Sequence, residues 1–240
     1  MRRGEKSNKM KKPTLTTLLT TAAITATAAL APTSTDAQVR LDANTSMNSK
    51  YLASSGSLFE DRVVNQSSLT GSQGGFWGSV WANTNSNHLS EVDITAGYGK
   101  NMGPISMGAG VGNFRLRDLN VDVRDLWVDA SLAYPLSPKL TLEHNLSAGE
   151  FDNTNGTYLK GNVSHGMNLG RLPLSLGASS TYNRGYFQDE NSLAVVQVEI
   201  GVSLTWKGVN LRPGVRLQKA IDKDNYNDEI VTSVSASYSR

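Results

Sequence analysis

The sequence contains no cysteine, only three histidines and no glycine-rich phosphate-binding motif, and each absence removes a class of function. Without cysteine, the 240-residue chain has no disulfide, no thiolate metal site and no cysteine nucleophile. His88 falls in a predicted loop and forms no ligand set with His144 or His165, so the sequence does not support a metal site. We therefore predict no metal, no cofactor and no phosphate chemistry.

The first 37 residues read as a targeting segment that lies outside any fold. Six basic side chains open the chain, the run from Pro13 to Thr35 carries no charge, and Thr35-Asp36-Ala37 resembles a small-x-small cleavage site. We predict a signal peptide at 1–37, with Met10 as an alternative start, and a mature chain of residues 38–240. An uncleaved membrane anchor is the alternative, although the uncharged run is rich in threonine and alanine.

Removal of this segment changes the charge of the chain. Residues 1–37 hold six of the 23 basic residues and two of the 21 acidic ones, so the mature part keeps 17 and 19 and has a net charge of −2. The basic character therefore belongs to the signal peptide. No nucleic-acid partner is expected.

The mature chain is dominated by two-residue alternation of apolar and polar side chains. Between Leu140 and Ala148 the even positions are mostly apolar, and between Ala194 and Trp206 the pattern is cleaner still. This period is typical of strands with one apolar face. The segment between Gly112 and Phe114 breaks the alternation, which suggests a β-bulge.

Twelve such strands can be placed, and their connections alternate between long and short. We expect long polar loops near residues 54, 84, 117, 151, 183 and 220 and short turns near residues 71, 101, 135, 170 and 207. The first strand is expected over Leu41–Ala53, followed by a loop at Ser54–Arg62. An even number of strands of about ten residues, with loop length alternating between the two ends, is typical of an up-and-down transmembrane β-barrel.

Aromatic residues gather at the strand ends beside the short turns. Amphipathic rings at these positions favour one membrane interface. The predicted interface residues are Phe76 or Trp77, Tyr98, Tyr134, Trp206 and Tyr238. Tyr238 also resembles the aromatic signal by which the barrel-assembly machinery recognises a last strand, although the chain ends in Arg240.

Segments along the mature chain resemble the TorF-type porin family of bacterial outer-membrane proteins. The similar runs are NSKYLASSGSL, SLAYPLSPKLTLEHNLSAGE, and GTYLKGNVSH followed by LPLSLGASSTYN. Family members typically have an aromatic residue and an arginine where this chain has Leu52-Ala53-Ser54. The resemblance implies an outer-membrane barrel whose solute is undefined, in contact with outer-membrane lipid.

If the apolar parity faces lipid, the opposite parity faces the lumen and carries charges of both signs. The predicted lumen residues are Asp93, Asp125, Asp129, Glu143, Lys160, Glu199, Arg212 and Arg216. Opposed charges across a constriction would orient a small polar solute or an ion. We therefore predict a passive porin-like channel. The sequence leaves its solute and its oligomeric state open.

The sequence leaves three other functions open. The same charges would pair and fill the lumen in a closed structural barrel. The outer loops, with Phe59, Phe151, Tyr186 and Phe187, would serve a surface-binding barrel. A lipid hydrolase would need His144 and His165 brought together by strand pairing, with Ser147 or Ser164 as nucleophile. No nucleophile motif surrounds these residues, so we predict no enzymatic activity.

Overall fold

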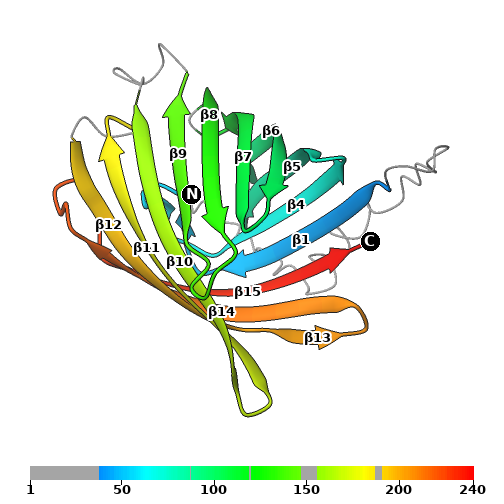
Figure 1. Ribbon diagram of the computed structural model, residues 1–240. Helices are drawn as coiled ribbons and strands as arrows, with labels where there is room; N and C mark the ends of the chain where they lie inside the picture. The colour runs from blue at the N-terminus through cyan, green and yellow to red at the C-terminus, as the bar shows by residue number, and fades with distance from the viewer. Residues whose placement is uncertain (1–37, 87, 119, 147–155, 187–190) are drawn as a thin grey trace, which may run out of the picture. The chain divides into compact units, whose positions relative to one another are not determined.

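The computed structural model describes residues 38–86, 88–118, 120–146, 156–186 and 191–240. Within these ranges the regular secondary structure is all strand, as Figure 1 shows. The elements are β1 (Arg40–Asn48), β2 (Tyr51–Leu52), β3 (Leu58–Glu60), β4 (Val64–Gln73), β5 (Phe76–Asn85), β6 (Leu89–Met102), β7 (Ile105–Leu116), β8 (Val121–Leu132), β9 (Lys139–Asn145), β10 (Thr157–Leu169), β11 (Leu172–Arg184), β12 (Asn191–Val202), β13 (Leu204–Trp206), β14 (Val209–Ala220) and β15 (Glu229–Ser239). No helix among the described residues is long and apolar enough to cross a bilayer.

The large sheet closes on itself as a twelve-stranded antiparallel barrel. Its order runs β12-β11-β10-β9-β8-β7-β6-β5-β4-β1-β15-β14-β13, and β12 also pairs with β14. The strands β12 and β13 are two parts of one barrel strand, interrupted at Ser203, and both pair with β14. The predicted fold class is therefore confirmed.

Connection lengths define two ends of the barrel. The long-loop end carries the connections at 49–63, 86–88, 117–120, 146–156, 185–190 and 221–228, whereas the short-turn end carries those at 74–75, 103–104, 133–138, 170–171 and 207–208. The connection at 86–88 is shorter than the predicted loop, and the one at 133–138 is longer than a tight turn. The remaining connections alternate as the sequence indicates.

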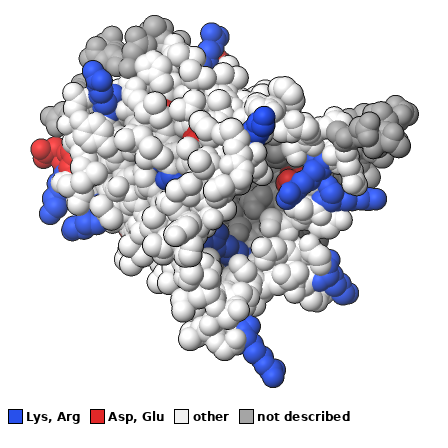
Figure 2. All heavy atoms as spheres, in the orientation of Figure 1, with Lys and Arg blue, Asp and Glu red and all other residues white. Residues whose placement is uncertain are grey.

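The apolar parity faces outward. On β12 the side chains of Val196, Val198 and Ile200 are exposed, while Val195 and Gln197 at the alternate positions are buried inside the barrel. The same division holds around the ring, so that leucine, valine, isoleucine and methionine make up much of the outer surface. In the view of Figure 2, the basic side chains lie mainly at the margins of a broad uncharged surface. Such an apolar band is what a lipid environment requires of a barrel.

The predicted bulge in β7 is wrong. This strand keeps an unbroken register with both β6 and β8. Phe114 and Leu116 break the apolar parity because they point inward, where Leu116 packs with Val121 and Val123 and Phe114 lies against that cluster. These apolar side chains are packed in a cluster inside the barrel at this end, so the strand does not need a bulge to turn them toward lipid.

The first strand also ends earlier than predicted. β1 stops at Asn48, and the following segment forms a separate two-stranded sheet in which Tyr51 pairs with Glu60 and Leu52 with Leu58. We call residues 49–63 the inner hairpin, because its contacts, described below, are with side chains on the inner face of the barrel.

Candidate functional site

The inner hairpin is tied to two distant walls of the barrel. The Tyr158 hydroxyl on β10 lies 3.1 Å from Ser54 Oγ, and Lys160 Nζ donates to the Ser54 carbonyl at 3.0 Å. Gln218 Nε2 on β14 donates to the Gly56 carbonyl at 2.9 Å. A Cβ on Gly56 would lie 2.6 Å from a methyl of Val195, so the hairpin backbone touches β12 directly. The hairpin therefore occupies the lumen near the long-loop end.

Glu60 fastens the other side of the hairpin to β5 and β6. Its carboxylate accepts hydrogen bonds from Asn83 Nδ2 at 2.6 Å, Ser90 Oγ at 2.8 Å and Asn85 Nδ2 at 2.9 Å. Three donors on one ionised acceptor form a strong anchor, because hydrogen bonds to charged groups are worth roughly twice as much as neutral ones. Nearby, the ring of Tyr51 lies 5.7 Å from that of Trp81.

The acidic lumen residues from β8 and β9 meet two tyrosines beside the hairpin. The Tyr186 hydroxyl lies 2.5 Å from Asp125 Oδ2 and 3.0 Å from Glu143 Oε1, and Tyr158 also donates to Glu143. Asp125, Glu143 and Tyr186 line a cavity of about 120 Å³. Asp93 also lines this cavity, together with Tyr51 and Phe59 of the hairpin. The hairpin and the two tyrosines cover this part of the inner wall, so these acidic side chains do not face an open, water-filled lumen.

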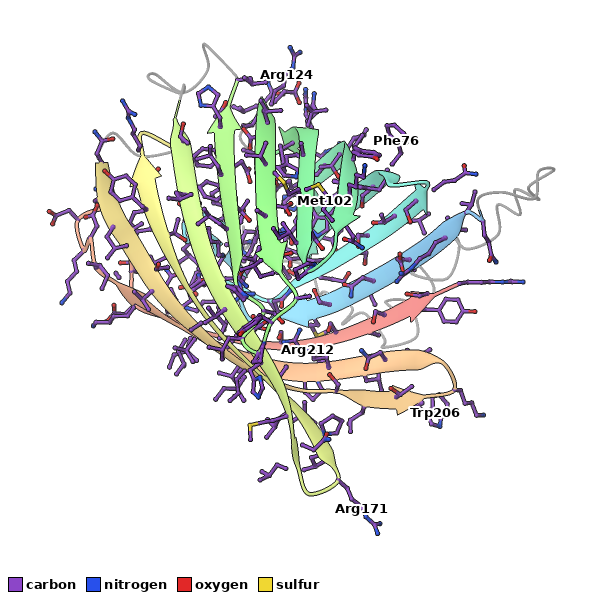
Figure 3. All side chains as sticks on the ribbon, in the orientation of Figure 1. Phe76, Met102, Arg124, Arg171, Trp206 and Arg212 are labelled. Carbon is purple, nitrogen blue, oxygen red and sulfur yellow. The ribbon has the colours of Figure 1, made fainter. Side chains whose placement is uncertain are left out.

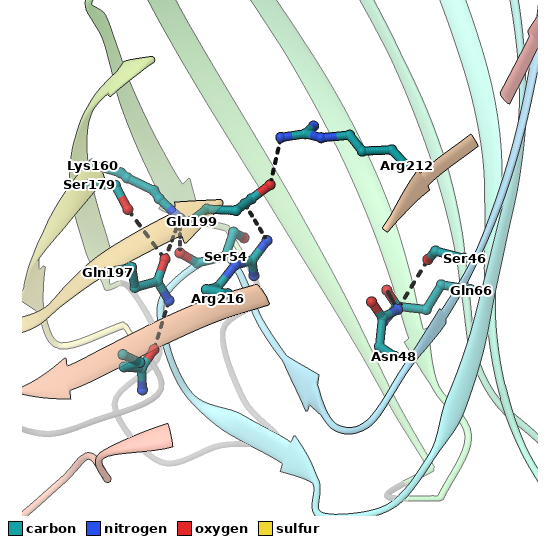
Figure 4. Close-up of polar contacts among 11 residues, drawn as sticks. Ser46, Asn48, Ser54, Gln66, Lys160, Ser179, Gln197, Glu199, Arg212 and Arg216 are labelled. Atoms are coloured by element: carbon teal, nitrogen blue, oxygen red, sulfur yellow. Dashed lines mark hydrogen bonds and ion pairs between the residues drawn. The ribbon is translucent and has the colours of Figure 1, made fainter. Parts of the chain in front are cut away.

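Glu199 organises the basic lumen residues. Arg212 Nη2 donates to its Oε1 at 2.8 Å and Arg216 Nη2 to its Oε2 at 3.3 Å. Both arginines lie on β14, where Arg216 is the register partner of Glu199 and Arg212 lies four residues before Arg216. Figure 4 shows Lys160 beside this group, where its Nζ lies 3.5 Å from Gln197 Oε1. Three cations thus surround one carboxylate and leave a local excess of positive charge. The guanidinium side chains remain between a third and a half exposed.

The structure separates the predicted lumen charges into three groups. Asp93, Asp125 and Glu143 lie beside the hairpin, while Lys160, Arg212 and Arg216 gather around Glu199. Asp129 lies apart, with Lys139 Nζ 3.5 Å from its carboxylate. Glu199, which the sequence groups with the acidic set, therefore belongs to the basic one.

The predicted interface aromatics divide between the two faces. Phe76, Tyr98, Tyr134, Trp206 and Tyr238 are exposed on the outer surface, and Figure 3 shows Phe76 and Trp206 pointing away from the barrel. Trp77 is the exception, because its ring lies 5.9 Å from that of Trp127 on the inner face. The alternation of a strand allows only one of two adjacent residues to face lipid, and here that residue is Phe76.

Strand pairing keeps the two strand histidines apart. His144 pairs with Thr157 at one end of β10, and its Nδ1 lies 2.9 Å from the threonine hydroxyl, whereas His165 is eight residues further along that strand. At the usual strand rise this separation is roughly 27 Å. Ser147 lies outside the described residues. The described part of the chain thus assembles no Ser–His pair from these residues.

The contact residues predicted for the outer loops also move inward. Phe59 packs edge to face with Tyr51 at 5.3 Å inside the barrel, and Tyr186 is buried with its ring 4.8 Å from that of Tyr158. Phe151 and Phe187 lie outside the described residues. Sequence reasoning missed Tyr158, although it shares the inward parity of Lys160 and could have been assigned to the lumen on that ground.

No protein-family model matches the chain, and no curated protein sequence matches it. Solved structures do resemble it. The NanC porin is 13% identical and covers 82% of this chain and 98% of its own, with a TM-score of 0.54. The KdgM porin in complex with disordered oligogalacturonate is 13% identical over 83% of this chain and 98% of its own, also with a TM-score of 0.54. At this identity the likeness shows a shared fold, that of a porin-like β-barrel.

Proposed function

We propose that the chain is an outer-membrane channel for passive diffusion of small polar solutes or ions. The observation that carries the proposal is the closed ring of twelve strands, with apolar side chains outside and charged and hydroxyl side chains inside. Such a cylinder matches a lipid environment outside and needs water inside. The resemblance to TorF-type porins and the shared fold with NanC and KdgM support the same assignment.

The path we propose runs beside the basic group around Glu199. The inner hairpin fills much of the lumen at the long-loop end, and a cavity of about 80 Å³ lies between it and this wall, lined by Asn48, Lys50, Gln66 and Arg216 among others. Because three cations surround one carboxylate there, the constriction favours anions and polar solutes with acidic groups.

The first experiment is single-channel recording in a planar bilayer. The mature chain is refolded, its barrel is verified by faster gel migration before boiling than after, and current is recorded under a salt gradient. We expect discrete current steps and a reversal potential whose sign shows that anions permeate more readily than cations. A verified barrel that never conducts, with or without its hairpin, would overturn the channel.

A closed structural barrel is the second candidate, and the anchored hairpin is the observation that favours it. Since Tyr51 pairs with Glu60, residues 52–59 can be replaced by Asn-Gly, a two-residue turn suited to a hairpin. If only this shortened variant conducts, the natural chain is a plugged barrel under these conditions. If both conduct, and the shortened variant conducts more, the hairpin is a constriction.

The maturation of the chain belongs to the same proposal. We propose cleavage before Gln38 and insertion by the barrel-assembly machinery through the last strand, β15, which carries Tyr238. Sequencing the amino terminus of protein taken from isolated outer membranes tests the cleavage. Retention of residues 1–37 in the membrane fraction would contradict it.

A further inference from the structure

One row of residues crosses four neighbouring strands on the inner face of the barrel. Trp77 on β5 pairs with Gly97 on β6, Gly97 pairs with Gly110 on β7, and Gly110 pairs with Trp127 on β8. We call these four residues the tryptophan row. A tryptophan stands at each end, and the two positions between them carry no side chain.

The glycines allow both indoles to lie flat on the wall. A Cβ added to Gly97 would lie 2.7 Å from the ring of Trp77, and one added to Gly110 would lie 2.5 Å from the ring of Trp127. Each indole thus occupies the space that a side chain at the neighbouring glycine would fill. Both tryptophans remain partly exposed, so each ring keeps part of its surface open to the lumen.

The two rings form a platform. Their centroids are 5.9 Å apart and their planes differ by 33°, so they lie side by side on one wall and do not enclose a space from several sides. On the short-turn side of the row, the wall at Gly99 is bare, since an added Cβ would meet only a backbone oxygen at 3.7 Å. A flat ligand could therefore rest on the platform and extend toward that end.

Charges near the platform are already paired or covered. Asp129, two residues beyond Trp127 on β8, has Lys139 Nζ at 3.5 Å. Asp125, two residues before it, is 1% exposed and contacts Tyr186. The platform itself is therefore electrically neutral, with hydroxyl groups of Ser79 and Thr95 in the next row toward the long-loop end.

We propose that the tryptophan row is a stacking site for a pyranose ring of a carbohydrate. One face of such a ring presents C–H groups, which suit the electron-rich face of an indole, and its rim presents hydroxyls. Here a neutral aromatic platform is bordered by hydroxyls and by the Asp129–Lys139 pair. The charged wall of β12 and β14 lies six strands away around the ring, which places it opposite the platform. A sugar crossing the barrel would thus meet an apolar wall on one side and hydrogen-bond donors on the other.

A quaternary ammonium ion is the competing ligand for exposed indoles. Such cations favour an aromatic cage in which several faces surround the charge. The platform offers two faces on one wall, and the nearby acids have partners, so the geometry favours the sugar. The two ligands make different predictions in one binding experiment.

The experiment measures sugar binding by calorimetry on the refolded barrel in lauryldimethylamine oxide micelles, a detergent that carries no sugar. Maltotriose is the probe, sorbitol is the control polyol without a ring, and choline is the control cation. We expect maltotriose to bind and both controls to fail. Trp77→Ala and Trp127→Ala should each weaken binding by roughly tenfold, the upper size of one aromatic stacking contact.

Matched variants distinguish a site from a general loss of structure. Trp206→Ala removes an exposed tryptophan from the outer face and should leave maltotriose affinity unchanged. Should an alanine variant fail to fold, Trp77→Phe and Trp127→Phe keep a ring and should weaken binding less. Maltotriose affinity that ignores both tryptophans, or choline binding in its place, would overturn the proposal.

This inference rests on the proposed channel only for the route by which sugar arrives. The calorimetry needs no current, so the two proposals can fail separately. Tryptophan-dependent binding in a barrel that never conducts would remove the channel and keep the sugar site. Conduction without maltotriose binding would keep the channel and remove the sugar site.

Discussion

The two ends of the barrel interior are built in opposite ways. At the long-loop end the inner hairpin fills the lumen, and every fully buried apolar side chain among the described residues lies in that hairpin, in a long connection or within five residues of one. Toward the short-turn end, the inner wall carries many glycines and serines, the indoles of the tryptophan row and the partly exposed charged pairs Asp129–Lys139 and Glu199–Arg212. One chain therefore contains a packed core and an open, polar tube in series.

The difference indicates where permeability and solute contact are controlled. Moving the hairpin requires breaking hydrogen bonds to β5, β10 and β14, so that end sets whether the lumen is open. The other end has few such contacts to break, and its side chains are free to meet solutes. Changes at the first end should alter opening, and changes at the second should alter selectivity or binding.

Single cysteines should show the largest contrast between the two ends. Because the natural chain has no cysteine, a thiol introduced at one position reports that position alone. Ser55→Cys replaces a residue 1% exposed in the hairpin, and Ser235→Cys replaces a half-buried residue on the inner face of β15. A small maleimide should label the thiol at position 55 at least about tenfold more slowly than the thiol at position 235. A tenfold difference corresponds to a free energy of about 1.4 kcal/mol for opening the hairpin. Equal rates would mean that the hairpin is not docked in solution.

Loss of the Glu60 anchor should release the hairpin. Glu60→Gln keeps the shape of the side chain but removes the charge that holds three donors. Hydrogen bonds to charged groups contribute about 1.5–3 kcal/mol each, so loss of even one should raise the open probability roughly tenfold or more. Single-channel recording measures this change.

Asp61→Asn is the matched control for the anchor, since Asp61 lies in the same hairpin and is largely exposed beside Lys50. Its recordings should resemble those of the natural chain. Equal opening in both variants would show that charge in the hairpin, and not the Glu60 contacts, governs the lumen.

The contrast also explains which parts of the structure could be predicted from sequence. Alternation such as that of β12 reports the lipid-facing side at every second residue, so strand number and barrel closure follow from local patterns. The inner hairpin has no such pattern. Its contacts depend on Gln218 and Tyr158, more than a hundred positions away, and its own residues are mostly small and polar. The choice between Phe76 and Trp77 likewise depends on which of them faces Gly97 across the sheet.

The selectivity of the pore should depend on the two arginines around Glu199. Replacing Arg212 and Arg216 with glutamine removes both guanidinium groups that donate to Glu199 and should shift the reversal potential toward cations. The permeability ratio should change by a factor of roughly three to ten, because partly exposed and salt-screened charges contribute about 1 kcal/mol. Arg171→Gln, at the exposed tip of the β10–β11 turn in Figure 3, is the control and should leave the ratio unchanged. An unaltered ratio in the double variant would remove both arginines from the path.

The smallest effect is expected outside the barrel wall, at Asp228 in the last loop. Lys219 donates a hydrogen bond to this carboxylate, and the Ala220 amide donates another at 2.9 Å. These contacts, with the charge of Lys223, hold the pKa of Asp228 below its ordinary 3.8. A lowered folded-state pKa means that the ionised group stabilises the fold above pH 3.8, and that this contribution is lost as the pH falls through the folded-state value. At pH 7, Asp228→Asn should therefore slightly lower the unfolding temperature, measured on gels as the temperature at which the fast-migrating band of the folded barrel disappears. The difference from the natural chain should vanish near pH 2. A difference that persists at pH 2 would assign the effect to the amide side chain itself and not to the lost charge.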